Sequence, residues 1–305
     1  MNILHLADFP ANEDYHARPD LSYTGFKVFK RSPLEYEHRF VKGFDPGPTP
    51  AMEFGSLIHA FALEPDTALT DYQVRVEMPL RSKAYKEMFV THLHMIGAEL
   101  GDRMDDELVA MSADELRDLE KTAPVRFVAE DDYERGLFCA KIARCHLPLY
   151  IGHKIEAAFY ARIEGVDVQC KCDCIDETGQ IYDIKTCADI HRFERGLAMG
   201  DMIYGDTWYR MVIEAATGFL PPPIRYVGIE TKQPHDCIVR WHPEDLYPMV
   251  KEEILGDLRR FAECQQDRQW PGLEDKAEIK LASFVRNKFF DLPEDFFNIN
   301  EPEGV

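Results

Sequence analysis

Asp173, Asp183 and Lys185 are residues whose types and spacing could do chemistry. Asp183-Ile184-Lys185-Thr186 follows Asp173 after one short turn, and the two segments have the pattern of adjacent strands. Because strand side chains alternate between faces, Asp183 and Lys185 project to the same side. Two carboxylates at close range repel each other unless a cation lies between them, and Mg²⁺ binds carboxylate oxygens, water and phosphate. The pattern therefore predicts a metal-dependent nuclease, and the alternative is a surface strand that carries an ordinary salt bridge.

These residues must be positioned by a sheet. Strand-like runs at 155–163, 166–175 and 180–186 are separated by hairpin signals at 164–165 and 176–179. The order of elements predicts an α/β domain with a central mixed sheet flanked by helices. Further strands are expected at 72–78, 224–230 and 237–241, and helices at 23–31, 33–40, 52–63, 82–122, within 141–152, at 189–199, at 204–217 and at 243–266.

Composition limits the class of protein. The chain has 305 residues, 45% of them hydrophobic, which suffices for one large domain or two small ones with a real core, and a single domain is expected. A net charge of -20 argues against a protein that coats nucleic acid non-specifically. No apolar run is long enough for a membrane span, and the eight cysteines lack a repeated CxxC framework, so we expect a reduced, cytoplasmic protein. The expected parts of this nuclease domain are an irregular segment (1–20), a mainly helical part (21–150), the catalytic sheet core (151–272) and a tail (273–305).

Three cysteines alternate along the second strand of this core. Cys170, Cys172 and Cys174 are expected to share one face, opposite Asp173. Alternating strand residues lie roughly 7 Å apart in a row, which is a poor arrangement for tetrahedral ligands. Core packing is therefore the favoured interpretation, and a cysteine-based metal-binding module is the alternative.

The chain resembles the PD-(D/E)xK nucleases of the RecB-like group. Besides Asp173 and 183–186, residues 21–36 resemble the opening helix of that family. Gly55 to His59 resembles its GxxxH motif, in the form seen in RecE-like exonucleases (exonuclease VIII type). Cys264 followed by Trp270-Pro271-Gly272 resembles the end of the same group. The resemblance covers residues 21 to 272 and implies a restriction-endonuclease-like core.

The resemblance also implies roles for individual residues. Lys185 corresponds to the catalytic lysine, and Glu156 matches an upstream glutamate near the site. One or two Mg²⁺ or Mn²⁺ ions are expected. The implied metal ligands are His59, Asp173, Asp183 and the backbone carbonyl of Ile184.

Substrate contacts depart from the family pattern. RecB-like nucleases often carry a QxxxY motif on the helix after the lysine, and here Tyr209 and Ile213 occupy those positions. Tyr209 or Arg210 is expected to substitute, and Lys30 with Arg31 is expected to line a DNA path, unless these are ordinary solubilising charges. The iron–sulfur branch has a cysteine where Ser32 stands, so no iron–sulfur cluster is expected.

The function that the resemblance implies is a phage-type recombination exonuclease. It would digest one strand of linear double-stranded DNA from an end, 5′-to-3′, and leave single-stranded DNA for a single-strand-annealing protein. A ring-shaped homo-oligomer around DNA is implied. The alternatives are another RecB-like nuclease, such as a Cas4-like enzyme or a structure-selective endonuclease, and a catalytically inactive domain that binds DNA or a protein partner.

Overall fold

The computed structural model describes residues 15, 18–44, 46–75, 78–149, 153–200 and 202–272. The chain divides into one compact unit of residues 1–270 and a second of residues 271–305. All helices and strands below belong to the first unit. The expected tail at 273–305 lies outside the described residues, as does most of the expected irregular segment at 1–20.

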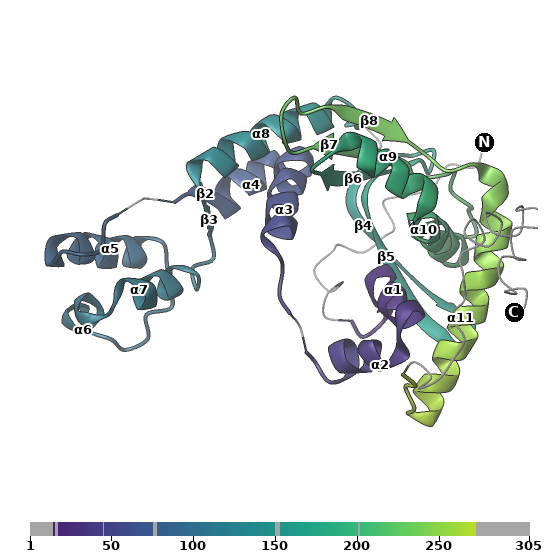
Figure 1. The fold of residues 1–305 in the computed structure, drawn as a ribbon, viewed down its shortest axis with the longest axis horizontal. Coiled ribbons are helices and arrows are strands. Elements are labelled where there is room, and N and C mark those ends of the chain that lie inside the picture. Colours follow the sequence, from purple (N-terminus) through teal and green to yellow (C-terminus); the bar gives the residue numbers. More distant parts are fainter. Residues whose placement is uncertain are drawn as a thin grey trace, which may run out of the picture. The chain divides into compact units, whose positions relative to one another are not determined.

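The core of the first unit is a mixed sheet with the strand order β1-β5-β6-β7-β8, and β4 pairs with β5 (Figure 1). Pairing is antiparallel for β4/β5, β5/β6 and β7/β8, and parallel for β1/β5 and β6/β7. The predicted central mixed sheet is therefore confirmed. The strands are β1 (Leu21–Ser22), β4 (Lys154–Ile163), β5 (Val166–Ile175), β6 (Ile181–Cys187), β7 (Arg225–Glu230) and β8 (Cys237–Arg240).

Local turn chemistry sets the two hairpins that join β4, β5 and β6. Glu164 and Gly165 both have positive φ angles, 49° and 79°, as a tight two-residue hairpin turn requires. In the next turn the Asp176 carboxylate accepts hydrogen bonds from the backbone N–H groups of Thr178 and Gln180, at 2.9 and 3.0 Å. The first turn connects β4 to β5, and the second connects β5 to β6, in antiparallel pairing in both cases.

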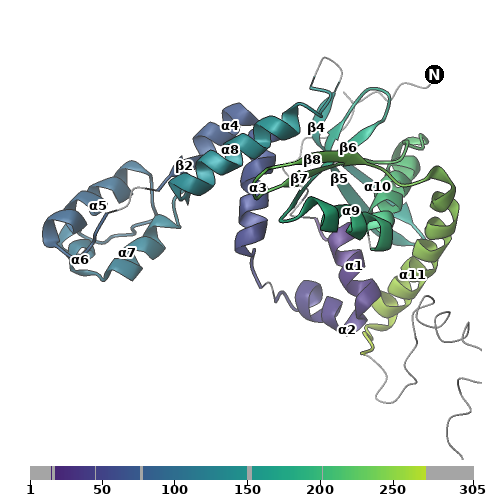
Figure 2. The same cartoon turned by 45° about the horizontal axis from the view of Figure 1, so that its top comes forward.

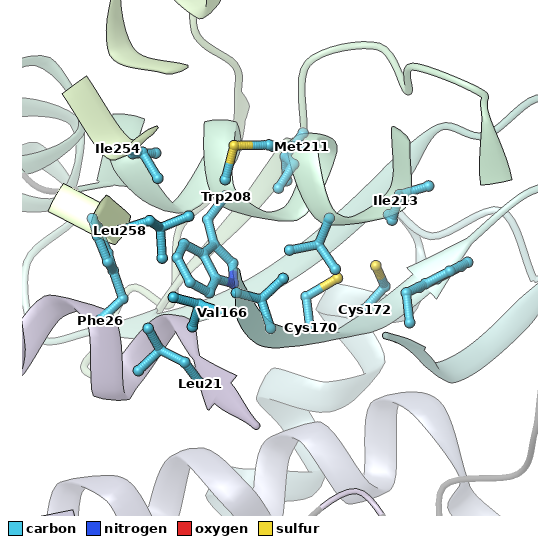
Figure 3. Close-up of a cluster of buried hydrophobic side chains, with 14 of the residues drawn as sticks. Leu21, Phe26, Val166, Cys170, Cys172, Trp208, Met211, Ile213, Ile254 and Leu258 are labelled. Carbon is cyan, nitrogen blue, oxygen red and sulfur yellow. The ribbon is translucent and has the colours of Figure 1, made fainter. Parts of the chain in front are cut away.

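One face of the sheet is covered by α1 (Tyr23–Arg31), α9 (Ile190–Met199), α10 (Met202–Thr217) and α11 (Tyr247–Asp267). Trp208 lies at the centre of this layer, among the side chains in Figure 3. Its ring stacks on Phe26 at 4.8 Å, and its Nε1 donates to the Gln169 carbonyl at 3.1 Å. This bond satisfies the buried indole N–H and ties α10 to β5.

The other face is covered by α3 (Pro50–Leu63), α4 (Pro65–Asp71) and α8 (Glu130–Arg144), which lie side by side in Figures 1 and 2. The short helix that the sequence predicts within 141–152 is corrected by the structure, in which α8 begins at Glu130 and ends at Arg144. The buried face of α8 consists of Gly136, Cys139, Ala140 and Ala143. These positions have helical spacing but small side chains, so their hydrophobic periodicity is weak. Their small size lets α3 approach: a Cβ on Gly136 would lie 2.6 Å from Leu57 Cδ2.

Residues 78–122 form a small helical cluster with a hydrophobic core of its own. The expected continuous helical stretch is divided into α5 (Lys83–Met95), α6 (Asp105–Ala110) and α7 (Ala113–Glu120), and Ser112 and Glu115 make the predicted capping box. Two short parallel strands, β2 (Tyr72–Val74) and β3 (Arg126–Val128), flank the cluster in sequence.

The remaining short elements are α2 (Pro33–Tyr36), a π-helical turn (Glu37–Val41) and a 3-10 turn (Glu244–Leu246). Among the described residues, no helix combines the length and hydropathy needed to cross a bilayer.

Candidate active site

One edge of β5 is shared between two strands. β1 pairs with residues 168–169 of this edge, and β6 pairs with residues 174–175. Residues 170–173 pair with no strand there in the part of the chain that the structure describes. The sheet therefore opens into a wedge between β1 and β6, at the position of the predicted catalytic carboxylates.

The two carboxylates flank this wedge. Extending the β5/β6 register places Asp173 opposite Asp183, but the ladder stops one pair earlier. The Asp173 Oδ2 instead accepts the backbone N–H of Ile184 at 2.7 Å. N–H and C=O of one residue in an extended strand point toward the same edge, so the Ile184 carbonyl also faces the wedge. This direction is compatible with the predicted ligand role of that carbonyl, which stays a prediction.

Burial and crowding of negative charge act on Asp173. Burial raises the pKa of its carboxyl, and Asp183 raises it further, while His59 and Lys185 lower it; the net result is a pKa of about 6. The His59 Nδ1 lies 3.4 Å from the Asp173 Oδ2. The ionised form of the Asp173 carboxyl group therefore requires nearby positive charge for its stabilisation.

Lys185 provides part of that charge. Its Nζ lies 2.6 Å from Asp183 Oδ2. Burial lowers the pKa of Lys185, but the two carboxylates, Asp183 first, more than offset this and raise it. The Lys185 side chain keeps 42% exposure, against 9% for Asp183, so the lysine reaches solvent from the wedge. The predicted acid, acid and lysine set is brought together.

His59 reaches the wedge because α3 lies close to β6. A Cβ on Gly55 would come within 3.2 Å of the Thr186 Oγ1. Because Gly55 has no side chain, α3 can approach β6 closely at this point. Residues four apart lie on one helix face, so His59, one turn after Gly55, also faces the wedge and reaches Asp173. This close approach gives the spacing of the GxxxH motif a physical reason.

Glu156 marks a switch of faces in the sheet. It has a φ of 52°, in the left-handed region that non-glycine residues rarely adopt. In the register of β4 and β5 it would oppose Asp173, and that pair is missing from the ladder. Cys172 packs in the layer under α10, whereas Cys174 packs in the layer under α3 and α8. The expectation that all three cysteines share one face is therefore wrong for Cys174, because alternation is interrupted at this point.

All three cysteines are nevertheless buried side chains of the hydrophobic core. Their burial confirms the core-packing interpretation. Cys170 and Cys172 lie in one core cluster and Cys174 in the other.

The left-handed backbone at Glu156 leads to a stability prediction. Glycine adopts this conformation without steric cost, whereas alanine does not. We expect Glu156→Gly to be more stable than Glu156→Ala by about 1 kcal/mol in urea unfolding. Both variants lose the same carboxylate, so their difference isolates the backbone. Equal unfolding free energies would contradict a strained backbone at this position.

A cleft of about 840 Å³ opens at the wedge. Several residues of its lining were not predicted from the sequence, and one of them, Lys171, forms an ion pair with Glu156. Lys171 lies two positions before Asp173, so strand alternation alone could have placed it on the cleft side. Asp183 is not part of the lining, but it forms an ion pair with Lys185, which is. The lining residues named above are Gly55, His59, Glu156, Lys171, Asp173 and Lys185.

Comparison with known proteins decides the family. Residues 22–281 match the family described as "PDDEXK-like domain of unknown function (DUF3799)". The chain belongs to this PDDEXK-like family. The match confirms the expected fold class, an α/β core with a central mixed sheet flanked by helices.

The PDDEXK-like fold is also found in a solved structure from Eubacterium rectale, described as a "putative exonuclease". The two chains are 11% identical, with a TM-score of 0.57, over 92% of this chain and 97% of the other. At this identity the likeness shows the fold alone. No curated protein matches the chain.

The substrate residues expected on α10 have different surroundings. Tyr209 lies next to the wedge: burial, followed by the nearby Asp183 and Asp173, raises its pKa well above the ordinary value. Arg210, in contrast, is 1% exposed and contacts Asp206, Glu244 and the Pro221 carbonyl. Its burial makes Arg210 a structural residue of this PDDEXK-like domain and not a substrate contact.

The basic residues expected along a DNA path, Lys30 and Arg31, form ion pairs with acidic side chains of the protein. Lys30 lies between Glu253 and Asp257 of α11, at 2.6 and 2.9 Å, and Arg31 pairs with Glu35. Neither residue lines the cleft. Because acidic partners already balance both charges, their placement favours the alternative of ordinary structural and solubilising charge.

Membership in the PDDEXK-like family implies a divalent cation. Among the residues that the structure describes, no three His, Cys, Asp or Glu side chains already surround one point as a complete ligand set. The donor types nevertheless fit: carboxylate oxygens with one imidazole suit Mg²⁺ or Mn²⁺, which keep several water ligands. His59, Asp173 and Asp183 would hold such an ion, with Asp183 exchanging part of its contact with Lys185.

Proposed function

We propose that this PDDEXK-like protein is a metal-dependent exodeoxyribonuclease that degrades one strand of linear double-stranded DNA. The observation that carries the proposal is the convergence of His59, Asp173, Asp183 and Lys185, from α3, β5 and β6, at a wedge that opens into a cleft. A sheet edge with two carboxylates and a lysine matches the needs of phosphodiester hydrolysis.

Each residue has a distinct task in this proposal. A bound Mg²⁺ or Mn²⁺ would supply positive charge to a phosphate oxygen and would favour ionisation of water. Asp173 and Asp183 provide hard oxygen ligands, and His59 provides the nitrogen ligand. Lys185 extends past Asp183 into the cleft, where its ammonium group can orient the attacking water or neutralise charge that develops on the phosphate.

The finer parts of the proposal come from the resemblance to RecE-like enzymes. They are 5′-to-3′ digestion, transfer of the single-stranded product to a single-strand-annealing protein, phage-type recombination in the cytoplasm, and a ring-shaped homo-oligomer around DNA. A net charge of -20 is compatible with such a ring if acidic residues lie on its outer surface.

The proposal is tested by digestion of end-labelled linear duplex DNA, with closed circular DNA as the control. We expect Mg²⁺ or Mn²⁺ to support digestion of linear DNA alone, and EDTA to stop it. Labels placed on the 5′ or the 3′ end report the polarity, and the mass of the protein in solution reports the oligomer. Nicked circles would instead identify an endonuclease of the same group.

A second candidate is a catalytically inactive domain that binds DNA. It is favoured by one observation: Ile213, at the position of the motif tyrosine, is buried in the core and cannot contact a strand. Binding of linear duplex without cleavage in either metal would support this candidate and contradict the enzyme.

A further inference from the structure

Arg126 lies on the wall of the cleft formed by β2 and β3. It stands directly opposite Tyr72 in the parallel register of these strands, and both residues line the cleft that contains Asp173 and Lys185. The Arg126 Nη1 donates to the Tyr72 Oη at 2.9 Å, and the guanidinium lies 5.5 Å from the ring centre. Strand pairing and this hydrogen bond thus hold an exposed guanidinium group in place.

Arg126 differs from the two lysines in the cleft because its charge is not balanced by a carboxylate partner in the described part of the chain. Lys171 is paired with Glu156, and Lys185 is paired with Asp183. Arg126 forms no ion pair with any carboxylate of the described residues, although the chain carries a net charge of -20. An unpaired arginine in so acidic a protein keeps its full charge for a ligand.

The acidic residues nearby make this arginine more important. The cleft is also lined by Glu64 and Asp71, which repel a nucleic-acid backbone. Without Arg126, the lysines that line the cleft would be Lys171 and Lys185, and both are already paired with carboxylates. A planar guanidinium can donate two parallel hydrogen bonds to phosphate oxygens, which a lysine cannot do.

We propose that Arg126, positioned by Tyr72, binds a backbone phosphate of the DNA strand beside the phosphate that is cleaved. This subsite rests on the proposed function and extends it: the β2–β3 ribbon becomes one wall of the DNA path. The subsite supplies affinity and strand position, while His59, Asp173, Asp183 and Lys185 carry out the chemistry.

The test measures both binding and turnover. Binding of an end-labelled linear duplex in EDTA, over a series of salt concentrations, gives the affinity and its salt dependence. We expect Arg126→Ala to weaken binding about tenfold. The negative slope of log affinity against log salt should become shallower by about one, because one phosphate contact is lost. In Mg²⁺, KM should rise about tenfold, with kcat changed less than about threefold, since a phosphate contact that remains unchanged during cleavage contributes to substrate binding.

Three further variants make the test specific. Arg162→Ala removes an exposed arginine, paired with Asp167 at the far hairpin of β4, and should behave as wild type. Arg126→Lys should restore the salt slope but only part of the affinity, because the bidentate geometry is lost. Tyr72→Phe should weaken binding by a smaller factor without changing the slope.

Two outcomes are decisive and distinguishable. If the wild type digests DNA and Arg126→Ala matches Arg162→Ala in affinity and salt slope, the subsite is overturned and the enzyme stands. If the wild type neither binds nor digests DNA, both proposals fail together. Should Arg126→Ala unfold, as judged by thermal denaturation, the lysine and Tyr72→Phe variants give the same decision.

Discussion

Lys185→Ala is expected to abolish digestion of linear duplex DNA, with a loss on the order of a thousandfold, while DNA binding survives. The reason is the position of the ammonium group. It lies 2.6 Å from Asp183 and reaches the cleft, so its removal takes charge from the proposed reaction centre but leaves the other residues that line the cleft unchanged. The measurement compares cleavage rates in Mg²⁺ with binding in EDTA on the same duplex.

Lys251→Ala is the matched control. Lys251 lies on α11, where it pairs with Glu214 at 2.7 Å, and it is not part of the cleft. Like Lys185→Ala, the Lys251→Ala variant removes one lysine and one ion pair, but it should leave cleavage unchanged. Full activity in Lys185→Ala would remove the lysine from the mechanism, whereas loss of binding would show that its main role is to hold DNA.

Asp206→Ala is expected to destabilise the protein by about 3 kcal/mol, because it disrupts a buried polar network. The Asp206 carboxylate is 1% exposed, accepts the backbone N–H of Ile224 at 2.7 Å and lies 3.4 Å from Arg210. Alanine would leave one buried N–H without an acceptor and would leave Arg210 with Glu244 as its remaining carboxylate partner. Urea unfolding followed by circular dichroism measures the change.

Asp206→Asn separates the two losses. The asparagine oxygen can still accept the Ile224 N–H, whereas the ion pair with Arg210 disappears. We expect this variant to lose about half as much stability as the alanine variant. Unfolding free energies of both variants within about 0.5 kcal/mol of the wild type would contradict a structural role for this network.

Local chemistry explains why part of the fold could be predicted. The conformations of the hairpins at 164–165 and 176–179 follow from their own residues, so their turn signals placed β4, β5 and β6 correctly. The alternation of Asp183, Ile184 and Lys185 was sufficient to place the acid and the lysine together.

Other features depend on contacts that no local pattern shows. Arg210 follows Asp206 by four residues, a spacing typical of a surface ion pair, but Glu244 and the Pro221 carbonyl complete its burial from distant segments. The switch of faces at Glu156 requires a backbone conformation that its side chain does not favour. The buried face of α8 consists of small residues that allow close helix packing, so the sequence there lacks the periodic large hydrophobic residues by which a helix is recognised.

The sharing of one β5 edge between β1 and β6 has a consequence for handling the protein. Leu21 and Ser22 are the residues that cover the end of that edge. A chain trimmed to begin at Tyr23 would expose main-chain donors and acceptors along β5, and such an uncovered strand can recruit a strand from another molecule. We therefore expect a chain that keeps Leu21 and Ser22 to aggregate less than one that begins at Tyr23.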